Sequence, residues 1–152
     1  MENTQKTVVV SIDPEQITRE VCAESACLNL MSPDEEMVIL SADNRNLINL
    51  YAETATANFV ANFAGFIAPE FRFPTESGAP IEIPLNIADD SPIPTRSLRL
   101  TMESIVADTV LERIYEADSR ISTLIRDRRK EREGMLRMLL LPPFATVKPT
   151  DY

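Results

Sequence analysis

Proline is distributed unevenly along the 152-residue chain, and this distribution limits where long helices can form. Six of the eleven prolines lie between residues 69 and 94. Proline lacks a backbone N–H and its ring clashes with the preceding helical turn, so no long helix can cross this region. The chain is therefore divided into two stretches, before and after the proline-rich region, that can each hold long helices.

The stretch before the proline-rich region contains a predicted extended segment and two predicted helices. Residues 7–12, Thr-Val-Val-Val-Ser-Ile, are mostly β-branched and predict a short strand or an extended arm. Asp13 and Pro14 mark the start of a helix that reaches about residue 30. A longer helix is expected from about residue 41 to residue 67, because apolar residues recur there every three or four positions. Its predicted stripe comprises Leu47, Tyr51, Ala55, Phe59, Phe63 and then Phe66 or Ile67, with Ile48 beside it.

Two shorter features complete the first half and the proline-rich region. Ser32-Pro33-Asp34-Glu35 repeats the helix-start signal, and residues 37–40 are expected to form a short helix or a buried connector. Residues 81–87, Ile-Glu-Ile-Pro-Leu-Asn-Ile, alternate apolar and other residues and predict a strand. Pro84 cannot donate to a ladder, which favours an edge strand or one arm of a hairpin with residues 71–73 as the candidate partner.

The stretch after the proline-rich region predicts two further helices. The first opens at Asp89-Asp90-Ser91-Pro92 and reaches about Ala117. Asp118-Ser119 caps the second, in which Gly134 either ends the helix or weakens it, and Pro142-Pro143 stops any helix. The predicted inner face of the first of these helices comprises Leu98, Met102, Ile105, Val106, Val110 and Ile114.

These patterns predict a mainly α fold. The expected architecture is a bundle of three to four helices, with a small β-hairpin or extended arm inserted between the second and third long helices. Residues 1–12 are expected to form an N-terminal arm, and residues 142–152 a C-terminal tail. Between them, residues 13–141 are expected to form a single helical domain with the β insertion at about 69–91.

The composition argues against catalysis and metal binding. The chain has no histidine, the side chain most used for proton transfer near neutral pH and a common metal ligand. Cys22 and Cys27 are spaced for neither a disulfide nor a zinc site and are expected to be small buried side chains. The acidic clusters Asp34-Glu35-Glu36 and Asp89-Asp90 lie where helix N-termini favour negative charge. We therefore interpret them as stabilising helix starts rather than as paired carboxylates that catalyse hydrolysis. We therefore expect no enzyme activity, no metal and no cofactor.

The charged residues are segregated. Residues 120–137 hold seven basic and three acidic side chains, a net charge of +4, so the rest of the chain carries −13 of the total of −9. Such a block can form a solvated helix face, a nucleic-acid contact, a membrane-surface contact or a contact with a second copy of the chain. The last is favoured, because an acidic body and a basic helix can meet head to tail on neighbouring copies. The candidate contact residues are Arg126, Arg128, Arg129, Lys130 and Arg132.

Two apolar segments offer the burial that a stable contact between copies requires. Residues 135–144 are apolar nearly all round and are either core or a docking segment; the candidate interface residues are Met135, Leu136, Leu139, Leu140 and Phe144. The predicted edge strand, through Ile81, Ile83, Leu85 and Ile87, is a candidate for pairing with residues 7–12 of another chain. Reversing Arg128, Arg129 and Arg132 to Glu is expected to leave the monomer folded and to disrupt assembly.

The order of these parts resembles the small helical head–tail connector (neck adaptor) proteins of tailed phages and prophages. The matching parts are the helix at about 41–67, "IEIPLNIADD" at 81–90, the helix from 92 and the basic helix "RDRRKERE" at 126–133. The resemblance implies a homo-oligomeric ring below the portal, an acidic channel wall, portal and tail proteins as partners, at most non-specific passage of DNA, and no catalytic residues.

The function expected from the sequence is therefore that of a non-enzymatic structural protein, a connector subunit of a phage or prophage. The alternative is a small cytosolic adaptor or regulatory domain that binds a protein partner through the apolar C-terminal segment. No stretch reaches the roughly 18 apolar residues of a membrane helix, and the first residues lack a secretory pattern. We expect no membrane contact, with the protein in the cytoplasm of the host cell and then in the virion.

Overall fold

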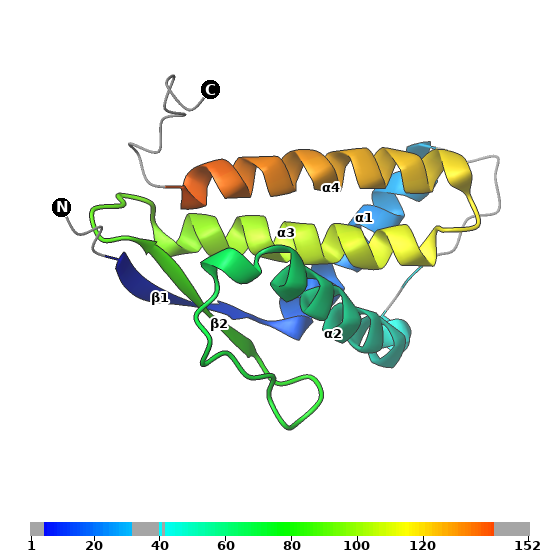
Figure 1. Ribbon diagram of the computed structural model, residues 1–152. Coiled ribbons are helices and arrows are strands. Elements are labelled where there is room, and N and C mark those ends of the chain that lie inside the picture. Colours follow the sequence, from blue (N-terminus) through cyan, green and yellow to red (C-terminus); the bar gives the residue numbers. More distant parts are fainter. Residues whose placement is uncertain (1–4, 32–39, 41, 142–152) are drawn as a thin grey trace, which may run out of the picture.

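The structure is a computed structural model and describes residues 5–31, 40 and 42–141. Within these ranges the chain forms four α-helices and two β-strands (Figure 1). Two short 3₁₀ turns, Ala42–Asn44 and Ala64–Phe66, flank the helix Arg45–Asn62. The predicted mainly α class is confirmed. The elements are β1 (Gln5–Ile12), α1 (Pro14–Met31), α2 (Arg45–Asn62), β2 (Ile81–Ala88), α3 (Thr95–Ile114) and α4 (Ser119–Leu140).

Helix α3 lies at the centre of the fold. Helices α1, α2 and α4 and strand β1 each pack against it, and α4 runs antiparallel beside it along its length (Figure 1). This position explains its burial pattern, in which charged as well as apolar residues are buried. The buried residues of α3 are Leu98, Met102, Glu103, Ile105, Val106, Ala107, Asp108, Val110 and Leu111.

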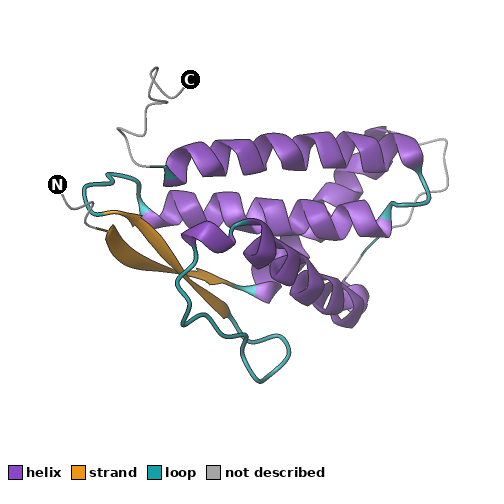
Figure 2. Ribbon diagram, viewed as in Figure 1, coloured by secondary structure: helices purple, strands orange, loops and turns teal. Residues whose placement is uncertain are grey.

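The two strands form an antiparallel sheet that is not a hairpin. Strand β1 pairs with β2 over eight residues, from Gln5 opposite Ala88 to Ile12 opposite Ile81 (Figure 2). The predicted position of the β element was therefore wrong, because one strand precedes all the helices and the other lies between α2 and α3. The predicted partner, residues 71–73, is loop. A three-residue segment ended by Pro74 offers far fewer ladder hydrogen bonds than β1 does.

Helix α2 differs from its prediction in length and at the first residue of its apolar stripe. It ends at Asn62 rather than residue 67, and the chain continues as a 3₁₀ turn. Leu47 is 42% exposed, whereas Ile48 is fully buried. Ala55 and Phe59 of the predicted stripe are buried, and Ile48 and Ala52 complete the buried face of the helix.

The helix starts follow the predicted caps at two places and not at a third. The Asp13 carboxylate accepts a hydrogen bond from the backbone N–H of Glu15 at 3.0 Å. Asp118 accepts from the backbone N–H of Arg120 and Ile121, as the predicted cap of α4 requires. The α3 helix starts only at Thr95, because Asp89 and Asp90 form the turn after β2. Gly134 lies inside α4 and does not end it.

Several predictions fall on residues 32–39 and 142–152, outside the described residues. They are the helix start at Ser32, the short segment from Met37, the cluster Asp34-Glu35-Glu36, the stop at Pro142-Pro143 and the interface residue Phe144.

Candidate functional site

The arginines of the basic helix contact carboxylates of their own chain. Helix α4 is positioned so that Arg128 and Arg132, one turn apart, face Asp108 on α3. Arg128 Nη2 donates to Asp108 Oδ1 at 2.6 Å, and Arg132 Nη1 donates to Asp108 Oδ2 at 2.7 Å. The Asp108 side chain is only 1% exposed. Both oxygens of this buried carboxylate are therefore occupied, and the pair of contacts sets the position of α4 along α3.

Helix α1 extends this ion-pair cluster. Arg128 Nη1 donates to Glu24 Oε1 at 3.3 Å, and the Ser104 hydroxyl donates to Glu20 Oε1 at 3.0 Å. Burial raises the pKa of Glu20 above its ordinary value. Burial also raises the pKa of Asp108, and Arg128 and Arg132 oppose that rise. Three helices thus meet at one network of paired charges.

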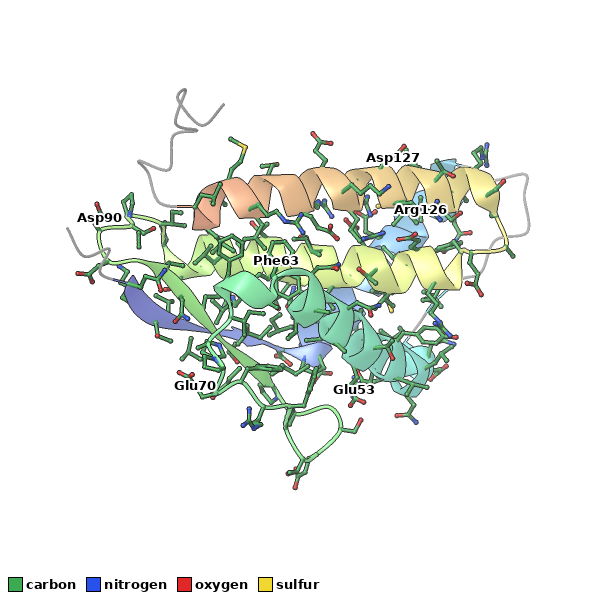
Figure 3. The ribbon with its side chains drawn as sticks, viewed as in Figure 1. Glu53, Phe63, Glu70, Asp90, Arg126 and Asp127 are labelled. Atoms are coloured by element: carbon green, nitrogen blue, oxygen red, sulfur yellow. The ribbon has the colours of Figure 1, made fainter. Side chains whose placement is uncertain are left out.

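A second cluster joins α3 and α4 closer to the connecting loop. Glu112 accepts from Arg126 Nε at 2.8 Å and lies 2.9 Å from Arg129 Nη2. Arg129 Nη1 also donates to Glu133 Oε1 at 2.8 Å, one turn along α4. Figure 3 shows Arg126 between α4 and α3, and Asp127 on the opposite side of α4.

These contacts neutralise most of the basic block. The +4 charge of residues 120–137 falls to +1 when the bound carboxylates Glu24, Asp108 and Glu112 are counted with it. Among the predicted contact residues, Lys130 and Arg126 are exposed on the surface, and Arg128, Arg129 and Arg132 are half-buried. Replacing Arg128, Arg129 and Arg132 with glutamate would place new carboxylates beside Asp108 and Glu112. The structure therefore gives a physical reason to expect unfolding rather than a folded monomer.

The predicted apolar interface residues divide into two groups. Leu136 and Leu140 belong to the core of this chain, and Leu139 is half-buried. Met135 is 57% exposed, and its neighbours Met138 and Leu141 are 76% and 46% exposed. We call Met135, Met138 and Leu141 the α4 end surface. Met138 was not among the predicted interface residues, although its spacing of three from Met135 places both on one side of a helix.

The predicted edge-strand residues face the core. Ile81, Ile83, Leu85 and Ile87 are each at most 3% exposed, and their strand pairs with β1 of the same chain. The edge of β2 that faces away from β1 is also partly paired, because Ile67 forms an isolated β-bridge with Leu85. Residues 7–12, which were predicted to pair with this strand from another chain, pair with it within the same chain.

Two surface grooves lie beside α2. One, of about 430 Å³, lies between α2, α3 and α4 and includes Tyr51, Asn58 and Arg113. The other, of about 490 Å³, lies between α2 and the loop at residues 73–79. The carboxylates that line the first groove beside α4, Glu112 and Glu133, are both ion-paired with arginine.

The remaining candidate groups are dispersed. Asp89 and Asp90 are exposed at the turn after β2 and line neither groove; Figure 3 shows Asp90 at that turn. Cys27 is exposed and Cys22 half-buried, so the expectation of two buried thiols was wrong for Cys27. Burial raises the pKa of the Cys22 thiol. In the described part of the chain, no group of three or more His, Cys, Asp and Glu side chains is placed to hold a metal ion.

No helix within the described ranges combines the length and the apolar character needed to cross a bilayer. Comparisons of the chain with protein-family models, curated proteins and solved structures found no match.

Proposed function

We propose that this chain is a non-enzymatic assembly protein that forms a homo-oligomeric ring, of the head–tail connector type of tailed phages and prophages. The α4 end surface is the observation that carries the proposal. Three large apolar side chains lie exposed at the end of a helix whose other outward residues are mostly charged. Burial of that surface against a neighbouring copy would supply the hydrophobic free energy of a stable contact.

The ion-pair clusters have a supporting role in this proposal. Arg128, Arg129 and Arg132 hold α4 on α3 and α1, so they orient the α4 end surface without contacting a neighbour. A rigid surface loses less conformational entropy on binding than a mobile one. A contact between this surface and a different surface of the next copy is heterologous, and it closes into a ring when the rotation permits.

The charge of the chain is consistent with a channel wall. With a net charge of −9, the chain repels a nucleic-acid backbone, which favours passage of DNA over binding to it. In this proposal portal and tail proteins are the further partners, and the protein resides in the cytoplasm of the host cell before it joins the virion.

The test is to place charge on the α4 end surface. The double variant Met135→Glu/Met138→Glu is expected to stay folded and to lose the large oligomer that the unaltered protein forms, leaving a species of no more than two 17.1 kDa chains. Size-exclusion chromatography with light scattering measures the mass, and electron microscopy shows whether the oligomer is a ring. Lys130→Glu is the matched control, because Lys130 is exposed on α4 outside this surface and its reversal should leave the oligomer intact.

A monomeric unaltered protein would contradict the ring. It would instead favour the alternative, a small adaptor that uses the same surface to bind a different protein.

A further inference from the structure

Strand β1 has one paired edge and one open edge. Its paired edge is matched residue for residue with β2, from Gln5 to Ile12. Within residues 5–31, 40 and 42–141 the sheet contains no third strand, and β1 lies at its edge. A strand edge without a partner presents backbone N–H and C=O groups that another strand can bind.

The hydrogen bonding of Pro84 shows which residues of β1 face the open edge. The Ala68 N–H donates to the Pro84 C=O at 2.9 Å, on the side of β2 away from β1. In an antiparallel ladder the N–H and C=O of one residue point to the same side. Pro84 therefore points its backbone away from β1, and its partner Val9 points its own away from β2.

The alternation then assigns the rest of the strand. Lys6, Val8, Val10 and Ile12 exchange backbone hydrogen bonds with β2, whereas Gln5, Thr7, Val9 and Ser11 present theirs to the open edge. All four of these outward-facing residues are exposed, and Val9 is 53% exposed. The position of Pro84 also costs no hydrogen bond to β1, since its missing N–H would face the other way.

The residues of β1 lack the sequence features with which proteins usually block edge pairing. The eight residues contain no proline, and the register is continuous without a bulge. Their one charged side chain, Lys6, donates to the backbone carbonyl of Ser91 at 3.3 Å. Residues 7–10 are all β-branched, which suits an extended conformation.

We propose that the open edge of β1 binds the same edge of a second copy, in antiparallel orientation about a two-fold axis. The two sheets then join into one sheet of four strands. An axis through Val8 pairs Thr7 with Val9 of the second copy and Gln5 with its Ser11, so all four outward-facing residues take part.

The strand itself favours a second copy as the occupant. A two-fold contact requires a surface that is complementary to itself, and a short uncharged edge meets that condition. In a chain of net charge −9, β1 carries no acidic residue, so the contact brings no carboxylates face to face along the strand. In the register about Val8, Lys6 lies opposite Val10 of the second copy rather than opposite its own equivalent.

The inference does not depend on the proposed ring, because β1 and the α4 end surface share no residue. It is therefore tested in the Met135→Glu/Met138→Glu variant, which removes the ring contact. We expect light scattering to give twice the monomer mass of 17.1 kDa for this variant. Adding Val9→Pro should halve that mass, because proline removes an N–H that points to the open edge and spares the ladder with β2.

The matched control is Val8→Pro in the same background. Val8 donates to β2, so proline there should lower the urea midpoint of unfolding, whereas Val9→Pro should leave it nearly unchanged. Val9→Lys is the second variant should Val9→Pro fail to fold, because lysine at an exposed edge position opposes pairing without changing the backbone. Either variant should yield a folded monomer.

Hydrogen exchange supplies an independent measurement. The amides of Thr7, Val9 and Ser11 should be slow in the dimer and fast in the Val9→Lys monomer, whereas those of Val8 and Val10 should be slow in both. The proposal is overturned if the Met135→Glu/Met138→Glu variant is monomeric at the highest concentration reached. It is equally overturned if the dimer persists, with fast exchange at Thr7 and Ser11, in the folded Val9 variants.

Discussion

Asp108 shows how a single residue can determine the role of a whole charged block. It lies on α3 within a run of buried apolar residues, and its carboxylate is bound by Arg128 and Arg132. An ionised carboxylate in such a place is costly unless it is paired. The arginines that were predicted to contact another copy are therefore needed first inside the monomer.

Removing one of these arginines is expected to destabilise the fold. Arg128→Met leaves Asp108 with one partner and should lower the free energy of unfolding by about 3 kcal/mol, the lower end for breaking a buried pair, because Arg128 is 31% exposed. Urea unfolding followed by circular dichroism measures this loss. Arg126→Met is the control, and its cost should be about 0.5 kcal/mol because Arg126 is 47% exposed.

The decrease in the free energy of unfolding that Arg128→Met causes should depend on pH. Without Arg128, the pKa of Asp108 in the folded state rises further above the ordinary value of 3.8. The folded variant then binds a proton more readily than the unfolded chain, so its stability falls as the pH rises above that value. The difference from the unaltered protein should be largest at neutral pH and should shrink towards pH 4. An equal difference at both pH values would contradict this account.

At the scale of the elements, α4 is a long helix that contains a glycine. Its Asp118 cap and the ion pairs of its arginines carry the helix past Gly134 to Leu140. Apart from the adjoining backbone of α4 itself, no atom of the described residues lies within 4 Å of a Cβ placed at Gly134. The glycine is therefore not required by packing, and it weakens the helix through its backbone entropy.

Gly134→Ala is expected to stabilise the protein. Alanine in a helix interior is more favourable than glycine by about 0.5–1 kcal/mol, so the urea midpoint should rise. Gly78→Ala provides a control of opposite sign, because Gly78 has a φ of 84°, a conformation that disfavours residues with a Cβ. If the two substitutions shifted the midpoint in the same direction, the assignment of Gly134 to a helix interior would be wrong.

At the scale of the whole molecule, the N-terminal strand is part of the core. Val10 and Ile12 are buried, and β1 pairs with β2 and packs against α3. The strand therefore connects the first residues of the chain to the middle of the sequence and to the central helix.

Deletion of residues 1–12 tests this role of β1. The shortened chain is expected to lose its cooperative unfolding transition and to bind a hydrophobic dye, because β2 and the apolar face of α3 lose their cover. Deletion of residues 1–4 alone, which removes no part of β1, should leave the transition in place. A sharp transition at an unchanged midpoint in the longer deletion would show that β1 is dispensable to the fold.

The local patterns that the sequence contains predicted several elements correctly. Apolar spacing identified the inner face of α3, from Leu98 to Val110, and Asp118 marked the start of α4. Alternation identified β2. These signals are local, since they arise from helical and strand periodicity and from hydrogen bonds between residues two to four positions apart.

The sequence by itself determined the class of the fold, the two segments that can form its strands and the caps at the starts of α1 and α4. Only the tertiary structure decided that β1 pairs with β2, whose paired residues are 69 to 83 positions apart in the sequence. It also decided that Arg128 and Arg132 bind Asp108, and that Met138 is exposed while Leu140 is buried. The physical reason is that periodicity specifies which residues share a face of an element. Which partner that face meets depends on contacts between residues far apart in the chain.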